Sequence, residues 1–168
     1  MPPNMLKAKA GGGLGGMDMA AMKRAADAVE ALKPQFGDWI AADVTALTEA
    51  RGRYAKTPGP QSRAALMRAA HDIKGFAPAL DFPLMAEIAA SLSRLLGEFP
   101  PAAAIPMSLI DAHVGAIQAI HRRDIRTVGD DTALTLCAEL DARVKEALAA
   151  ARKTRDLWNP TAGSADQG

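Results

Sequence analysis

Five consecutive residues near the middle of the chain, His71-Asp72-Ile73-Lys74-Gly75, form its clearest chemical pattern. They lie in a stretch that favours helix, and residues three and four apart on a helix share a face. Lys74 and Gly75 are therefore each one turn from His71. Free imidazole titrates with a pKa of about 6.5, so a neutral ring nitrogen is available as a nucleophile at pH 7. The spacing indicates a nucleophilic histidine with a mobile cation at its side.

Gly75 suggests that something large must reach the imidazole ring of His71. Glycine inside a helix costs roughly 1 kcal/mol relative to alanine, and this chain is rich in alanine. Our interpretation is close approach, because a Cβ at position 75 would stand in the way of a bulky group. Packing gives an alternative interpretation, in which Gly75 is a contact point between two helices.

Length and composition predict one all-helical domain. The chain has 168 residues, of which 49% are hydrophobic and only 4% aromatic, and its formal net charge is +1. Without a basic run, nucleic acid is not expected as a partner. The single cysteine, Cys137, rules out an internal disulfide and a cysteine-based zinc site. No apolar run approaches the roughly 20 residues that cross a bilayer. We expect a cytoplasmic protein that does not bind membranes.

The apolar spacing predicts an antiparallel up-down four-helix bundle with additional N- and C-terminal helices. Residues 17–153 are expected to form this domain, between a flexible Gly-rich tail (1–16) and a flexible C-terminal tail (154–168). The break between the first two helices is placed at Pro34, and Asp81 is expected to be the N-cap of the fourth. The predicted helices are 17–33, 34–54, 61–80, 81–96, 107–125 and 130–153.

Each of the five predicted helices from residue 34 onward has an apolar stripe that should face the core. His71 is not on the stripe of its helix, so its ring should point toward solvent beside Met67 and Pro78. Pro78 removes one backbone hydrogen bond and should bend the helix just beyond the histidine. The stripes are Phe36, Ile40, Val44 and Leu47; Leu66, Ala70, Ile73, Ala77 and Leu80; Leu84, Ile88, Leu92 and Leu95; Ile110, Val114, Ile117 and Ile120 with His121; and Leu134, Cys137, Leu140, Val144 and Leu148.

The five-residue pattern resembles the H-x-[LI]-K-G signature of histidine-containing phosphotransfer (HPt) domains. The similarity continues through Phe82-Pro83-Leu84, Ile88-Ala89-Ala90-Ser91-Leu92 and Asp111-Ala112-His113-Val114. These segments are similar to single-domain alphaproteobacterial members, and the resemblance covers about residues 35–125. Such domains are helical bundles that pass a phosphoryl group between a histidine and the aspartate of a receiver domain.

This resemblance implies a phosphoprotein of a two-component system and assigns roles within a multistep phosphorelay. His71 would be the phosphoacceptor, Lys74 would stabilise phosphate oxygens as a point charge, and Gly75 would give steric access. The chain would need no cofactor of its own, because the receiver supplies Mg²⁺. It would be a reversible carrier without autonomous kinase activity, since the sequence has neither a P-loop nor a kinase Gly-rich loop.

The expected partners are response-regulator receiver domains and hybrid histidine kinases, and the chain is expected to be a monomer.

Ser93 takes the place of a polar residue, often glutamine, that in the family forms a hydrogen bond to the second ring nitrogen of the histidine, so a bridging water would be needed. Asp81 replaces a glycine at the turn, where aspartate tolerates left-handed backbone. The residues expected to contact the partner are Met67, Arg68, Pro78, Ser93 and Arg94. A basic rim of Arg63, Arg68, Lys74 and Arg94 would suit an acidic receiver surface, although scattered surface arginines are the default expectation.

Two other functions remain open. The chain is alternatively a dimerisation and phosphoacceptor fragment of a sensor histidine kinase, or a helical adaptor whose histidine is incidental. An obligate four-helix dimer would favour the kinase fragment. His113 and His121 are eight residues apart, which does not suit a shared metal, so structural roles are expected and no metal site is predicted. Cys137 is expected to be a small core hydrophobe.

Overall fold

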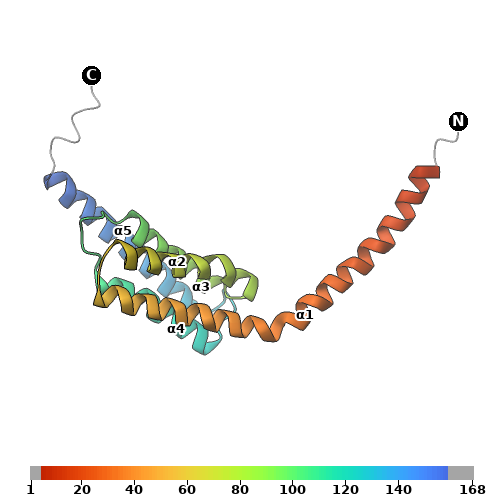
Figure 1. The fold of residues 1–168 in the computed structure, drawn as a ribbon, viewed down its shortest axis with the longest axis horizontal. Helices are drawn as coiled ribbons and strands as arrows, with labels where there is room; N and C mark the ends of the chain where they lie inside the picture. The colour runs from red at the N-terminus through yellow and green to blue at the C-terminus, as the bar shows by residue number, and fades with distance from the viewer. Residues whose placement is uncertain (1–4, 159–168) are drawn as a thin grey trace, which may run out of the picture. The chain divides into compact units, whose positions relative to one another are not determined.

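The computed structural model describes residues 5–158, with side chains described from residue 18 onward. This part of the chain is helical and contains no strand (Figure 1). The chain forms two compact units, Met1–Asp38 and Trp39–Gly168. The division between them falls inside the segment 17–153 that the sequence assigns to a single domain.

Helix α1, Met5–Lys56, is continuous through Pro34, so the predicted helix boundary there is wrong. Proline removes its own N–H donor and disfavours helix in the residue before it, but it leaves the hydrogen bonds on either side intact. Residues 5–16 are helical in the structure instead of forming an irregular tail, and residues 1–4 lie outside the described part.

Helix α2, Pro60–Phe76, is followed directly by the short 3-10 helix η1, Ala77–Leu80. The regular helix ends two residues before Pro78, at the place where the sequence predicts a bend. Asp81 then has φ 63° and ψ 33°, the left-handed conformation that aspartate tolerates. Helix α3, Pro83–Glu98, has Phe82 as its N-cap without a side-chain capping bond, so the predicted capping role of Asp81 is wrong. Asp81 instead ends η1.

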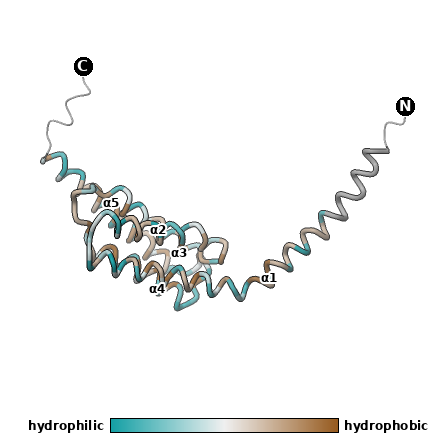
Figure 2. Tube along the Cα trace, viewed as in Figure 1, coloured by the Kyte–Doolittle hydropathy of each residue, from teal (hydrophilic) through white to brown (hydrophobic). Residues whose placement is uncertain are grey.

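Helix α3 lies at the centre of the second unit, against α2, α4 (Met107–Arg123) and α5 (Asp131–Trp158). Its apolar character explains this position, because nine of its sixteen residues are buried. Figure 2 shows hydrophobic and hydrophilic residues interspersed along the helices, as expected when one side of each faces a core. The C-terminal part of α1 meets α4 through an Arg51–Asp111 ion pair of 2.7 Å and a 2.9 Å bond from Gln118 to Thr48.

In the four predicted helices between residues 34 and 125, Phe36 and His121 are only partly buried, whereas the other residues of the predicted stripes are buried. On α5, four of the five predicted residues are buried, but Leu134 is 40% exposed. Ala133 is buried in its place, so the stripe runs through Ala133, Cys137 and Leu140. α5 also continues to Trp158, five residues past its predicted end, and residues 159–168 lie outside the described residues. No helix in the described part combines the length and the apolar character needed to cross a bilayer.

Candidate functional site

His71, Lys74 and Gly75 all lie on the exposed face of α2. The opposite face is fixed by Leu66, Ala70 and Ile73, which are completely buried, so the rotation of the helix about its axis is set by the core. The sequence pattern therefore gives the orientation of the histidine correctly. An exposed imidazole next to an exposed lysine on a rigid helix is accessible to a group as large as another protein.

Neither polar group of this pair is engaged elsewhere among the residues with described side chains. The hydrogen bonds to imidazole nitrogens in residues 18–158 are made by His113, not by His71. The ion pairs of the same residues do not include Lys74. The ring and the ammonium group are thus available for a ligand that carries negative charge.

Gly75 faces open space. A Cβ placed at this position would meet no atom within 4 Å outside its own helix backbone and chain neighbours. The alternative interpretation of Gly75 as a helix–helix contact point is therefore wrong, because no second helix approaches it. The access interpretation remains a prediction, and the geometry is compatible with it.

Apolar side chains flank the exposed pair along α2 and η1. Phe76 is 62% exposed and Met67 is 39% exposed, and Pro78 is also exposed at the surface. Large apolar groups in such positions commonly belong to interaction sites. Met67 and Pro78 were expected to contact a partner, whereas Phe76 was not singled out in the sequence. Its position next to Gly75, off the apolar stripe, is the signal that identifies it.

One contact between α2 and α3 indicates the register of the two helices. The two helices run antiparallel through the short turn at η1 (Figure 1), and the Met67 sulfur lies 3.6 Å from the position of a Cβ on Gly97. One turn further along α2 and one turn back along α3, the corresponding residues are His71 and Ser93. The Ser93 hydroxyl oxygen is buried and has no hydrogen-bond partner among the described residues.

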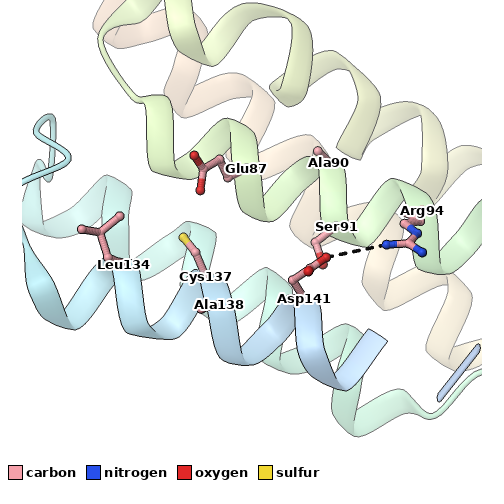
Figure 3. Close-up of a pocket in the computed structure, with 8 residues that line it drawn as sticks. All are labelled: Glu87, Ala90, Ser91, Arg94, Leu134, Cys137, Ala138 and Asp141. Atoms are coloured by element: carbon pink, nitrogen blue, oxygen red, sulfur yellow. Dashed lines mark ion pairs between the residues drawn. The ribbon is translucent and has the colours of Figure 1, made fainter. Parts of the chain in front are cut away.

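The arginines near the site differ in what they contact. Arg94 is held on the α5 side of α3, with ion pairs to Glu98 at 3.3 Å and Asp141 at 3.8 Å, the second of which is drawn in Figure 3. Arg68 is exposed on α2. Arg63 donates to the carbonyls of Leu96 and Phe99 and so stabilises the C-terminal end of α3.

The ion pair of Arg94 borders a groove of about 520 Å³ between α3 and α5 (Figure 3). The groove is lined by Glu87, Ala90, Ser91, Arg94, Leu134, Cys137, Ala138 and Asp141. Burial raises the pKa of the Cys137 thiol to about 11, with the charge of Glu87 as a second cause. The thiol is therefore protonated at neutral pH, which agrees with the prediction of a small core hydrophobe.

Asp43 is a site neighbour that the sequence did not identify. Its pKa is raised above the usual value, first by partial burial and second by the negative charge of Asp72. The carboxylates of Asp43 on α1 and Asp72 on α2 are thus close enough to repel each other, and Asp72 directly follows His71. The available signal was weak: Asp43 sits next to Val44 on the border of the apolar stripe, and only the pairing of the two helices shows what it faces.

His113 has a structural role, as expected. It is fully buried, its Nδ1 donates to the Leu109 carbonyl at 2.7 Å, and its Nε2 lies 3.0 Å from the Ser91 hydroxyl. A carbonyl can only accept, so the ring carries its proton on Nδ1 and accepts from Ser91 at Nε2. Burial lowers the pKa of His113, although the bond to Leu109 opposes this effect.

No group of three or more His, Cys, Asp or Glu side chains in the described part of the chain is arranged to hold a metal ion. No family model, curated protein or solved structure matches this chain. The function must therefore be argued from the exposed pair on α2 and its surroundings.

Proposed function

We propose that this protein is a histidine phosphotransfer protein of a multistep phosphorelay, which accepts and donates a phosphoryl group at His71. The observation that carries the proposal is the exposed face of α2, where His71 and Lys74 are accessible and Gly75 leaves open space. The resemblance of these residues to the HPt signature supports the same conclusion. The phosphoryl donors and acceptors would be receiver-domain aspartates, including those of hybrid histidine kinases.

We further infer the finer architecture that this function requires. In it, the Trp39–Lys56 part of α1 and helices α2, α3 and α4 form an antiparallel up-down four-helix bundle. Helix α5 and the first part of α1 are the additional C- and N-terminal helices. The support is the contact of α3 with α2 and α4, together with the polar contacts between α1 and α4. The bundle gives α2 a rigid backing, which a phosphoryl carrier needs for positioning.

The transfer step balances without a cofactor bound to this chain. A lone pair on the His71 ring attacks the phosphorus of an aspartyl phosphate, and the P–O bond to the aspartate breaks. The electron pair stays on the departing carboxylate. Phosphoryl transfer depends mainly on positioning and on compensation of negative charge. In this proposal Lys74 provides one positive charge, and the receiver provides Mg²⁺ and the aspartate.

Ser93 would act as a positioning residue. Its buried hydroxyl has no partner among the described residues, and we infer its proximity to His71 from the register that the Met67–Gly97 contact indicates. A water molecule bridging this hydroxyl to the second ring nitrogen would give both groups a partner and fix the orientation of the ring. Arg68 and the exposed apolar side chains Met67, Phe76 and Pro78 would contact the receiver.

The test is phosphoryl transfer from a panel of phosphorylated receiver domains to the purified chain, followed by mapping of the acid-labile phosphate. We expect the label at His71 and its loss in the His71→Gln variant. His121→Gln is the matched control, because His121 is a partly exposed histidine on α4 and should not affect labelling. Wild-type protein that no receiver labels would favour the adaptor, and label on His71→Gln would contradict the assignment of the acceptor.

A further inference from the structure

The first unit presents a helical face whose apolar side chains are exposed. Met19 is 73% exposed, Met22 64%, Val29 48% and Leu32 38%. Figure 2 shows hydrophobic positions recurring between hydrophilic ones along the coloured part of this stretch. Such a series is unusual on a helix in contact with water, because each side chain would gain free energy by burial.

Three of these residues, Met19, Met22 and Val29, have the spacing of a coiled-coil seam. Met19, Met22, Ala26, Val29 and Lys33 follow one another at intervals of three, four, three and four residues. This is the a/d pattern of a heptad repeat, with Lys33 at an a position. Most helical stability in proteins comes from packing an apolar face, and in this part of α1 Met19, Met22 and Val29 are exposed instead. We therefore expect this seam to pack against a partner helix.

We propose that the partner is a second copy of this chain, and that two copies pair through residues 19–33 in antiparallel orientation. This pairing places Ala26 of each chain opposite Val29 of the other, so that the smallest seam residue lies against a β-branched one. Met22 of each chain then lies opposite Lys33 of the other.

The charge of Lys33 favours the antiparallel over the parallel orientation of the two helices. In a parallel, in-register pair the two Lys33 side chains would meet across the axis, and their ammonium groups would repel each other. In the antiparallel pair the methylene stem of Lys33 lies along Met22, while its ammonium group keeps its 2.6 Å ion pair with Glu30 of the same helix. The antiparallel arrangement therefore removes a like-charge contact.

The residues that flank the seam have complementary charges. Lys23 and Glu30 each directly follow a d residue and so occupy e positions. In an antiparallel coiled coil, e positions face e positions of the other helix. Because Met22 lies opposite Lys33 and Val29 opposite Ala26, Lys23 of one chain faces Glu30 of the other, and the contact occurs twice by symmetry.

This dimer uses residues outside the exposed face of α2 and does not depend on the proposed function. It departs from the monomer that the sequence led us to expect. It also differs from a kinase fragment, whose dimer would be formed by the helices that carry the phosphoacceptor histidine. Here the two copies would be joined through the first unit only.

Sedimentation equilibrium of the full-length chain tests the proposal. At tens of micromolar, the wild type should approach twice the chain mass of 17.6 kDa. Lys23→Glu and Glu30→Lys should each weaken the dimer by roughly tenfold, because both symmetric pairs become like-charged. The double variant Lys23→Glu/Glu30→Lys should recover the wild-type dissociation constant. Arg24→Glu is the matched control, since Arg24 lies next to Lys23 but on the outer side of the helix.

A second variant tests the apolar seam. Met22→Glu/Val29→Glu should give the mass of one chain at every concentration, with the helical circular dichroism of the second unit retained. A wild type that is monomeric throughout, or a dimer that survives Met22→Glu/Val29→Glu, would overturn the proposal. A double charge reversal that does not recover dimerisation would overturn the antiparallel pairing.

A monomer that instead binds vesicles of anionic lipid would show that the face meets a membrane. Phosphoryl transfer at His71 is measured in a separate experiment, so failure of the dimer proposal can be told apart from failure of the proposed function.

Discussion

The three histidines of this chain illustrate how the same side chain acquires different roles from its surroundings. His113 is completely buried and holds two hydrogen bonds, whereas His71 is exposed beside an exposed lysine. His121 is partly buried, with its ring centre 6.4 Å from that of Phe82. His71 combines full exposure with Lys74 one turn away on the same face of its helix, as the proposed transfer of a phosphoryl group between proteins requires.

Lys74→Ala is expected to slow phosphoryl transfer without unfolding the protein. The side chain is exposed and makes no ion pair among the described residues, so its removal disturbs no packing. Loss of one positive charge near the phosphoryl oxygens should reduce the rate by roughly tenfold, below the ~10²-fold typical of enclosed sites, because water screens the charge. Single-turnover transfer from a phosphorylated receiver measures this. Lys153→Ala, an exposed lysine on α5, serves as the control, and equal rates for both variants would remove the assigned role.

Asp43→Asn should stabilise the protein slightly at neutral pH. Burial and the charge of Asp72 raise the pKa of Asp43, so the folded state holds the proton more tightly than the unfolded state. Stability from this group is therefore lost as pH rises above the unfolded value of 3.8 and through the raised folded pKa. The amide removes this unfavourable charge. Urea denaturation at pH 7 should show a higher midpoint than wild type, and a lower midpoint would contradict the account. Asp38→Asn on the same helix is the control.

Helix α2 has one buried face and one exposed face. The buried stripe from Leu66 to Leu80 was predictable because it follows the helical period closely, and every member of it is buried. The exposed face was predictable for the same reason. The C-terminal end of α2 was also predictable in outline, since Pro78 cannot continue a regular helix and η1 begins one residue before it.

Gly75→Leu is expected to separate stability from function. The added side chain meets open space, and replacing a helical glycine should stabilise α2 by roughly 0.5–1 kcal/mol. The same side chain should obstruct a receiver that approaches His71, so transfer should slow. Thermal unfolding and transfer kinetics are measured on the same preparation. Gly115→Leu is the matched control: Gly115 is an exposed helical glycine on α4, where an added Cβ would also meet no atom within 4 Å. A Gly75→Leu protein with wild-type transfer would end the access interpretation.

The buried imidazole of His113 should make the free energy of unfolding of the whole protein depend on pH. Burial lowers the pKa of His113 below its unfolded value of 6.5, so below that pH the unfolded state binds a proton that the folded state does not. The free energy of unfolding should therefore decrease as pH falls from 6.5, with a slope of at most about 1.4 kcal/mol per pH unit from this group. Urea denaturation between pH 7 and the onset of carboxylate titration measures the slope.

The control for this prediction is a variant without the buried imidazole. His113→Leu should lose most of the slope in this pH range, whereas His71→Gln, which removes an exposed ring, should keep it. If His113→Leu does not fold, the titration of His113 in the wild type can be followed by nuclear magnetic resonance. An apparent pKa at or above 6.5 would then contradict the proposed effect of burial.

Local periodicity was enough to predict the helical class, most residues of the core stripes and the exposed face of His71. Local periodicity could not decide whether α1 stops at Pro34, since one lost hydrogen bond is tolerated when its neighbours persist. It also could not show that Ala133 is buried while Leu134 is exposed, or that Asp43 is near Asp72. The hydrogen bonds of Arg63 to carbonyls at the C-terminal end of α3 were equally beyond its reach. Each of these depends on the pairing of segments distant in the chain. Only the tertiary structure brings such segments together, and there packing and charge select among the local possibilities.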